Sequence, residues 1–458
     1  MNRFFGMILV IAGTLAGVVL LSAGFYLASG WLGWGFNAAA NWLAGTPGAV
    51  SRAAVYYGAS VANVVTLLLV VLMVSASFLT VAERKWSALM QNRIGANRIK
   101  VFGTALGGIP FLLADALKML TKERVEPTGR TRILYELAPL LAFAPVFALF
   151  AIVPVGPPIE LGQVPGLVGS VAANAVEPIA LQVSRTDTGL LYVFAIASLQ
   201  VYGTSLAGWA SNNKLALLGG VRASSQMISY EVSLGLALVG NMIAYRTLRL
   251  DEMVVAQGTP VLGPIPALGI LLQPIGFLIF FASAFAETKR APFDLPEGES
   301  EIVGYFIEYS GMKFGLMFLA EFVEIVVLSG IVTAVFLGGW HPVLFEATLK
   351  ESLTPFWFAA VGAGAFIAKM IVMMWLQLTI RWLLPRFRFD QIQKLCWKIL
   401  LPAALTNIFV TAAALLLDPS MQLLAWLGVV TLVVIAVLTA AVGRAPAAEA
   451  GAHAAAGH

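Results

Sequence analysis

The sequence predicts an all-α, polytopic transmembrane helix bundle of about ten spans. Three observations predict it: the 458-residue chain is 59% hydrophobic, only 11% of its residues are charged, and long apolar runs recur along it. Soluble domains carry about a quarter charged residues. A helix needs about 20 apolar residues to cross a bilayer core of about 30 Å. The mean hydropathy of +0.88 likewise indicates a lipid-embedded chain.

Ten apolar runs are long enough to cross a membrane. They lie near residues 5–28, 60–82, 133–155, 189–211, 223–244, 266–288, 313–338, 356–384, 396–417 and 421–443. The first could be mistaken for a secretory signal, because Arg3 precedes it and small residues follow. Its apolar stretch is longer than the roughly 7–15 residues of a typical signal core, which favours a retained anchor.

The distribution of Lys and Arg supports this layout. Loops 83–132, 212–222, 287–313 and 381–398 hold 20 of the 28 cations, whereas the alternate loops hold five. The positive-inside rule places the first set, and with it both termini, in the cytoplasm. A net charge of +4 could suggest nucleic acid as a partner. We exclude it, because the cations lie in short loops between apolar runs.

Two segments differ from simple spans. Residues 103–120 are apolar, but Asp115 and Lys118 lie one helical turn apart and Lys100 and Lys122 flank the segment. This pattern predicts an amphipathic helix along the cytoplasmic surface. The Ala/Gly/His-rich tail, residues 444–458, has a composition typical of disorder.

The chain lacks the ligands of fixed redox cofactors. It has a single cysteine, Cys396, and three histidines, two of which lie in the tail. Neither G-x-G-x-x-G nor G-x-x-x-x-G-K-[ST] occurs, so nothing in the sequence indicates a nucleotide site. We expect no cofactor bound by this chain, and no iron–sulfur cluster or paired-histidine haem.

The strongest local signal is a run of acids that begins at the end of the sixth apolar run and continues into the seventh. A third of the chain's 24 acids lie within 38 residues, at Glu287, Asp294, Glu297, Glu299, Glu301, Glu308, Glu321 and Glu324. A solvated loop is the ordinary interpretation of such a segment. Glu321 and Glu324 fall inside an apolar run, however, where a carboxylate is costly and usually functional. Carboxylates clustered away from water titrate as a coupled set, which suits a proton path.

Other charges lie close to the predicted spans. Glu231 begins one span and favours a functional role, whereas Glu136 is better explained as a structural charge at a helix end. Lys369 lies well inside a span, and both interpretations stay open. Glu83, Arg84 and the 91–98 segment precede the amphipathic helix, and this arrangement could frame an opening for an amphiphile with a polar head.

These segments together resemble one family. They are Ala82-Glu-Arg-Lys, residues 91–98, Ala114-Asp-Ala-Leu-Lys118, residues 222–232, the acidic segment and Pro385-Arg-Phe-Arg-Phe-Asp-Gln391. The ordered series covers about residues 60–417. It resembles the H subunit of bacterial NADH-quinone oxidoreductase (respiratory complex I), equivalent to mitochondrial NADH dehydrogenase subunit 1.

The resemblance implies a membrane subunit of a proton-pumping complex in the bacterial inner membrane. Its quinone tunnel would involve Arg84, Arg93, Asp115, Arg290 and Phe293. Its acidic proton-coupling path would involve Glu231, Glu287, Asp294, Glu297, Glu299, Glu301, Glu308 and Glu321. Quinone would be the substrate, while NADH, FMN and iron–sulfur clusters would belong to partner subunits. The other complex I subunits and membrane lipids would be its partners.

The resemblance also implies a domain layout: an extra span and loop in 1–59, the family core of eight spans in 60–417, and a further span in 418–443. Lys289 stands where the family usually has Asn, which adds a cation to the acidic segment. Two other interpretations compete with this one: an anchor subunit of a membrane-bound hydrogenase or ferredoxin-linked complex, and a secondary ion transporter. The intact E-G-E-S-E run favours the quinone enzyme, and the lack of an inverted repeat counts against a transporter.

Overall fold

The computed structural model describes residues 60–61, 63–99, 108, 110–159, 178–263, 265–298, 304–342 and 346–455. The predicted span 5–28, and Glu299 and Glu301, lie outside these residues. The helices in chain order are η1 (Leu67–Val74), α3 (Ser75–Met90), α4 (Pro110–Thr121), α5 (Arg132–Phe150), α6 (Gly189–Ala210), α7 (Lys214–Tyr245), α8 (Leu250–Gln257), α9 (Gly269–Leu272), α10 (Pro274–Glu287), α11 (Met312–Phe336), α12 (Glu346–Ser352), α13 (Pro355–Leu383), α14 (Phe389–Leu395), η4 (Cys396–Leu400), α15 (Leu401–Leu417) and α16 (Gln422–Ala455).

Within the described ranges, eight helices are long and apolar enough to cross a membrane. They are Asn63–Met90, Arg132–Phe150, Gly189–Ala210, Lys214–Tyr245, Met312–Phe336, Pro355–Leu383, Phe389–Leu417 and Gln422–Ala441. Two short antiparallel hairpins, β1 (Gly156–Ile159) with β2 (Ile179–Leu181) and β3 (Pro260–Leu262) with β4 (Ile265–Pro266), lie in the connections. The predicted polytopic helical fold is confirmed.

Several predicted boundaries differ from the structure. Helix α3 continues to Met90, so Glu83 and Arg84 lie on a helix rather than in a loop. Helix α7 begins at Lys214, because the Asn213 side chain caps it by accepting a hydrogen bond from the Leu215 amide (2.9 Å). Helix α16 continues to Ala455. The predicted disorder of residues 444–458 stays a prediction.

The predicted span 266–288 is broken at Gln273. Helix α9 ends at Leu272 and Pro274 begins α10, so the apolar helix Pro274–Glu287 is short. The Gln273 side chain donates to Thr411 Oγ1 (2.6 Å) and accepts from Asn407 Nδ2 (2.6 Å). These bonds join the break to α15. A broken helix is tolerated in a membrane where neighbouring helices supply such polar contacts.

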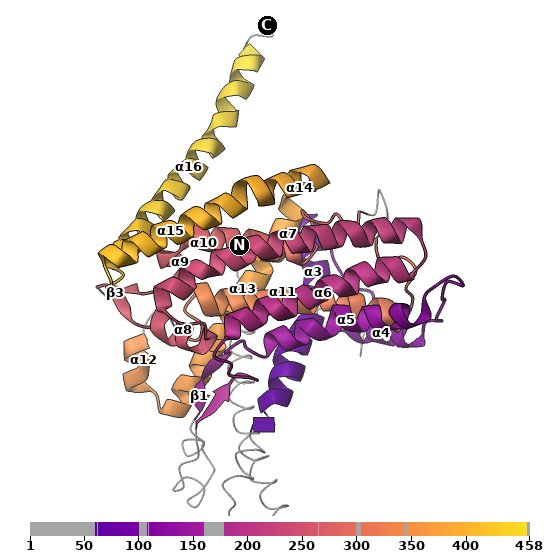
Figure 1. Ribbon diagram of the computed structural model, residues 1–458, viewed down its shortest axis with the longest axis horizontal. Coiled ribbons are helices and arrows are strands. Elements are labelled where there is room, and N and C mark those ends of the chain that lie inside the picture. The colour runs from indigo at the N-terminus through magenta and orange to yellow at the C-terminus, as the bar shows by residue number, and fades with distance from the viewer. Residues whose placement is uncertain are drawn as a thin grey trace, which may run out of the picture.

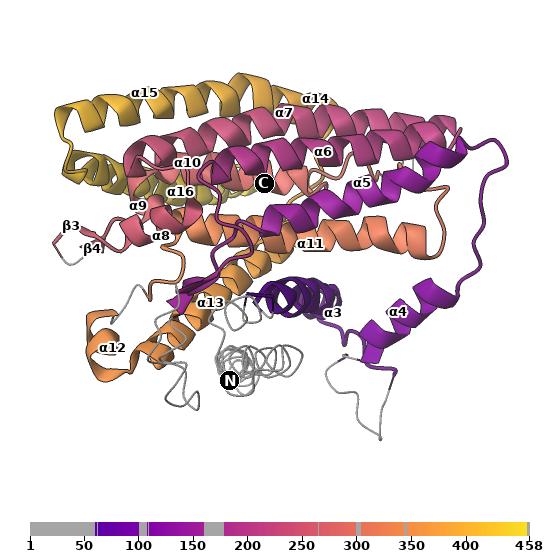
Figure 2. The same cartoon turned by 60° about the horizontal axis from the view of Figure 1, so that its bottom comes forward.

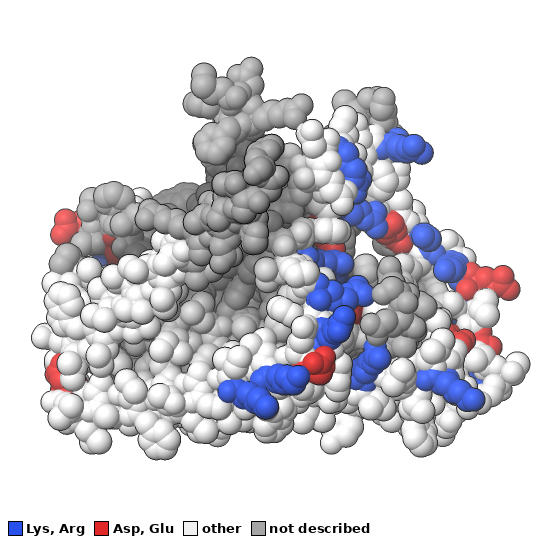
Figure 3. Space-filling view, turned by 90° about the horizontal axis from the view of Figure 1, so that it is seen from above, with Lys and Arg blue, Asp and Glu red and all other residues white. Residues whose placement is uncertain are grey.

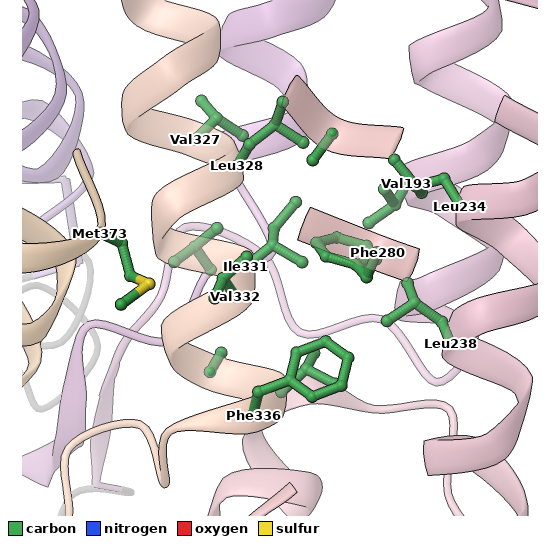
Figure 4. Packing of buried hydrophobic residues seen from close by; sticks show 14 of the residues in the cluster. Val193, Leu234, Leu238, Phe280, Val327, Leu328, Ile331, Val332, Phe336 and Met373 are labelled. Atoms are coloured by element: carbon green, nitrogen blue, oxygen red, sulfur yellow. The ribbon is translucent and has the colours of Figure 1, made fainter. Parts of the chain in front are cut away.

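The long helices lie side by side, and α11 is the most enclosed of them (Figures 1 and 2). It packs against α3, α5, α10 and α13, and 78% of its most apolar window is buried. Figure 4 shows Val327, Ile331 and Phe336 of α11 packed against side chains of neighbouring helices. Any polar residue of α11 is consequently held away from lipid and water.

The molecule carries its cations mainly at one end. Lys and Arg gather there in Figure 3, over the side where α4 and the start of α5 lie in Figure 1. Helix α4 lies at the edge of the bundle, where it contacts α3 and α11, and is joined to α5 by an extended connection (Figure 2). Its Leu113, Leu117 and Leu120 are all exposed. They form one apolar stripe, as an interfacial helix requires.

Candidate functional site

The site begins where α10 ends. After Glu287 the chain turns at Lys289, whose backbone is left-handed (φ 55°), and the side chains of Lys289 and Arg290 become buried. Gln226 of α7 fixes this turn by donating to the carbonyls of Ala286 (2.7 Å) and Phe293 (2.8 Å). The turn therefore directs two consecutive cations into the bundle.

The other side of the loop packs closely on α7 at Gly219. A Cβ at this position would collide with the backbone of Tyr305 and Gly304. Glycine is needed because only a residue without a side chain lets the two backbones approach so closely. This contact brings Tyr305 over the acids of α11.

Arg290 joins two helices through their acids. Its Nη1 lies 3.0 Å from Glu83 Oε2 on α3, and its Nε lies 3.4 Å from Glu321 Oε2 on α11. Arg381 of α13 also pairs with Glu83. The Arg290 guanidinium stacks on the Phe322 ring, 4.1 Å from its centroid. A guanidinium stays charged in proteins, so Arg290 is a fixed positive centre.

Glu321 also forms hydrogen bonds with a tyrosine and with a second carboxyl group. Tyr305 Oη donates to Glu321 Oε1 (3.3 Å), and Glu297 forms a side-chain hydrogen bond with Glu321. A hydrogen bond between two carboxyl groups requires a proton on one of them. Burial, and then the charge of Glu321, hold the pKa of Glu297 well above its ordinary value.

Lys289 makes the second ion pair. Its Nζ lies 3.4 Å from Glu324 Oε2, and the two side chains are 1% and 2% exposed. Gln200 of α6 donates to the same Glu324 oxygen (2.7 Å). Burial would lower the pKa of Lys289, but Glu324 and the other nearby acids raise it above its ordinary value. Lys289 is therefore held as a cation.

We define the acidic cluster as Glu83, Glu297, Glu321 and Glu324, which these contacts join, together with Glu287. Glu287 is 5% exposed and lies within electrostatic range of Glu324, Glu231 and Lys289. Glu231 is half-buried on α7. Four predicted path residues, Glu231, Glu287, Glu297 and Glu321, are thus brought together in one electrostatic group.

Two other predicted path residues lie at the edges of this group. Asp294 Oδ2 pairs with Arg386 Nη2 at 2.7 Å. Glu308 accepts from Asn213 Nδ2 (2.6 Å), and its carbonyl accepts from Tyr135 Oη (2.7 Å). Asp294 thus holds the loop to the connection between α13 and α14, and Glu308 holds it to α5 and to the start of α7. Both belong to the same loop as Glu297, and the negative charge of Asp294 helps to raise the pKa of Glu297.

The predicted access residues divide into an outer and an inner set. Arg84 Nη2 pairs with Asp115 Oδ2 at 2.6 Å, which joins α3 to α4, and the two side chains are 47% and 39% exposed. Arg93 is exposed and bonds to Gln91 Oε1 (2.6 Å). Arg290 and Phe293 are buried. The Phe293 ring packs between those of Tyr230 (5.7 Å) and Phe387 (5.5 Å).

Sequence reasoning did not assign a role to several residues of the site. Glu83 and Lys289 had a signal, since Glu83 is an acid among cations and Lys289 departs from the family pattern. Glu324 was noted as an acid inside an apolar run. Gln200 and Tyr305 gave no readable signal, because one amide or phenol in an apolar stretch is common.

Lys369 lies outside the acidic cluster and bonds to backbone carbonyls. Its Nζ donates to the carbonyls of Leu337 (2.7 Å), Gly339 (3.0 Å) and His341 (2.7 Å), which follow the C-terminus of α11. A cation at the end of a helix satisfies carbonyls that have no partner within the helix. Of the two interpretations of Lys369, the structure supports the structural one.

Fold and site together define a multi-pass helical membrane protein that encloses a group of carboxylates inside its bundle. In the part of the chain that is described, no group of three or more His, Cys, Asp or Glu could hold a metal ion. A family model described as NADH dehydrogenase matches residues 62–412.

Individual relatives agree with this match. The chain is 39% identical to the NADH-quinone oxidoreductase H subunit 1 of Cytophaga hutchinsonii, over 77% of this chain and 96% of that protein. It is 41% identical to the H subunit 1 of Geobacter metallireducens, over 77% and 95%, and 42% identical to the H subunit 2 of Syntrophobacter fumaroxidans, over 76% and 93%. The chain belongs to the family of NADH-quinone oxidoreductase H subunits. It is a subunit of that enzyme complex, and the other subunits are its partners.

Proposed function

We propose that the acidic cluster couples quinone reduction to proton movement in complex I. The observation that carries this proposal is the convergence of carboxyl groups inside the bundle: Arg290 pairs with both Glu83 and Glu321, and Lys289 pairs with Glu324 one helical turn further along α11. Carboxyl groups so close together exchange protons as one set, and a new charge nearby changes how many protons the set holds. Glu231 and Glu287 continue the path toward α7 and α10, while Asp294, Glu299, Glu301 and Glu308 supply acids along the loop.

The same proposal places the quinone access between α3 and α4. Arg84, Arg93 and Asp115 bound its outer part, and Arg290 and Phe293 bound its inner end. The support is geometric: Arg290 touches Glu83 on α3 and Glu321 in the acidic cluster. A charge that develops on bound quinone would act on Arg290 and through it on Glu321. Arg290 can transmit this change without releasing its own proton.

The proposal extends to the setting of the protein. The cation-rich end faces the cytoplasm of a bacterial inner membrane, and both termini lie on that side. The peripheral subunits that dock there hold NADH, FMN and the iron–sulfur clusters, the last of which reduces the quinone. Neighbouring small membrane subunits and lipids cover the apolar faces.

The test replaces path acids by their amides in the intact complex. We expect Glu231→Gln and Glu297→Gln to lose proton pumping and quinone-linked NADH oxidation by tenfold or more, on the scale of about 1.4 kcal/mol per factor of ten. Oxidation of NADH by an artificial acceptor should be unchanged, because that reaction bypasses the quinone. Glu252→Gln, an acid at the opposite end of the molecule, serves as the matched control.

The proposal fails if both variants pump protons at the wild-type rate. The access region is tested separately, by labelling membranes with a photoreactive quinone analogue and mapping the adduct. Labelling confined to segments outside 83–98, 110–121 and 289–293 would overturn the proposed access without affecting the acidic path.

A further inference from the structure

Two consecutive cations face two acids that lie one helical turn apart. Lys289 and Arg290 follow each other in the loop after α10, and Glu321 and Glu324 lie on α11. Arg290 pairs with Glu321, and Lys289 pairs with Glu324. The two ion pairs are therefore neighbours, and a charge change in one acts on the other at short range.

The pairs differ in their balance of charge. Arg290 pairs with Glu83 and Glu321, and Arg381 pairs with Glu83, so two cations balance two acids. The charges that act on Lys289 are Glu324 and Glu321 of α11, Glu287 of α10 and Glu297 of the loop. Tyr305 also lies in the field of Glu324. Lys289 thus interacts with four acids, of which Glu321 also pairs with Arg290, so its charge affects most of the cluster.

Glu324 keeps one oxygen unused. Among the described residues, Glu324 Oε1 and Gln200 Oε1 are buried acceptors without a hydrogen-bond donor. The other oxygen of Glu324 accepts from both Lys289 and Gln200. A buried acceptor without a donor is unfavourable. Glu324 is therefore placed to receive a proton or a hydrogen bond from water at Oε1.

We propose that Lys289 and Glu324 form a positioning pair that sets the pH at which the acidic cluster exchanges protons with the quinone site. The inference rests on the proposed coupling function. Lys289 favours ionised carboxylates around it, and Glu324 opposes them, so the pair leaves the cluster nearly unbiased. Removing one partner biases the cluster in one direction, and removing the other biases it in the opposite direction.

The experiment measures quinone-linked NADH oxidation against pH in membranes that contain the whole complex. Lys289→Asn should move the acid limb of the profile to higher pH by about one unit or more, because the lost cation leaves the acids easier to protonate. Glu324→Gln should move the same limb to lower pH. The double variant should return close to the wild-type profile.

Three comparisons keep the test decisive. Lys289→Arg preserves the charge and should leave the profile unchanged. The exposed pair Lys394–Asp390 (3.3 Å, side chains 64% and 60% exposed) is the matched control, and removing both of its charges should shift nothing. Artificial-acceptor oxidation and the amount of assembled complex report folding. If Lys289→Asn does not assemble, the downward shift of Glu324→Gln and its reversal in the double variant still test the pair.

Shifts in the same direction for both single variants, or none, would overturn the positioning role. The result also separates this role from the proposed function. If Glu231→Gln and Glu297→Gln abolish pumping while the pair variants keep the wild-type pH profile, only the positioning role is wrong. If those two acid variants pump normally, the coupling proposal itself is wrong.

Discussion

The molecule contains two groups of charged residues that differ in their access to water. At the end opposite to the cation-rich one, Arg249 lies 2.9 Å from Asp251, 3.3 Å from Glu252 and 3.4 Å from Asp187. The side chain of Asp187 is 93% exposed, whereas those of Lys289 and Glu324 in the acidic cluster are 1% and 2% exposed. Asp251, the nearest partner of Arg249, is 17% exposed, so the first group lies at a partly solvated surface and the second lies inside the bundle.

The pKa values of acids in the two groups are shifted in opposite directions. Burial would raise the pKa of Asp251, but its bonds to Arg249 lower it below the ordinary value. Burial and Glu321 raise the pKa of Glu297. Donors lock an acid in its charged form, whereas an acid that faces another acid away from water can take up a proton. Ion pairing by itself therefore does not make a proton-exchanging site.

The largest effect should come from removing Arg290, the central cation of the buried group. Arg290→Met leaves Glu83 and Glu321 without their shared partner inside the bundle, and breaking a buried pair costs about 3–5 kcal/mol. We expect little assembled complex in membranes, as measured by native gel electrophoresis. Arg249→Met should cost less, about 1 kcal/mol, because Asp187 and Glu252, two of its three partners, are 93% and 50% exposed and water can solvate them. Equal amounts of complex in the two variants would contradict the comparison.

Lys369 sharpens the comparison, because it is a buried cation that bonds to carbonyls rather than to acids. Lys369→Met leaves three carbonyls after α11 without this donor and should destabilise the protein by about 1–3 kcal/mol. Thermal unfolding of the purified complex measures this loss. The pH profile of the assembled fraction should match wild type, and a shift like that of Lys289→Asn would assign Lys369 to the proton path instead.

The helices were predictable from the sequence, whereas most contacts between them were not. Apolar length and cation distribution predicted the helices, because crossing a bilayer is a constraint that each span meets by itself. The break at Gln273 was not predictable, since it depends on Asn407 and Thr411 of a distant helix. Likewise, a run of acids predicted a group of carboxylates near the membrane, but not that Glu83 or Gln200 would contact it. Such contacts are set by packing between helices, which periodicity does not encode.

The pH dependence of stability should separate the two groups further. The pKa of Glu297 is raised above 4.5 in the folded protein. Between 4.5 and the folded-state pKa, the folded state therefore binds more protons than the unfolded state. Stability falls as pH rises through this range. Glu297→Gln should therefore unfold at a higher temperature than wild type at about pH 8, with a smaller difference at about pH 5.

Asp251 gives the opposite sign. Its pKa is lowered below 3.8, so its contribution is present above that value and is lost only as pH falls through the folded-state pKa. Asp251→Asn should lower the unfolding temperature equally at about pH 5 and about pH 8. The same unfolding measurement checks both variants, and parallel curves for wild type and Glu297→Gln would contradict the assignment of the acidic cluster.

The smallest effect should come from Arg84–Asp115, an exposed pair at the proposed quinone access. An exposed pair contributes up to about 1 kcal/mol, so Asp115→Asn should raise the KM for quinone by at most about fivefold, with kcat unchanged. The increase should shrink at high ionic strength, because salt screens exposed charges. Asp390→Asn removes an acid that is also exposed (60%, against 39% for Asp115) and lies away from α4, so it should leave KM unchanged. If Asp115→Asn instead lowered kcat, Asp115 would act with the enclosed acids, and exposure would no longer distinguish the two kinds of charged group.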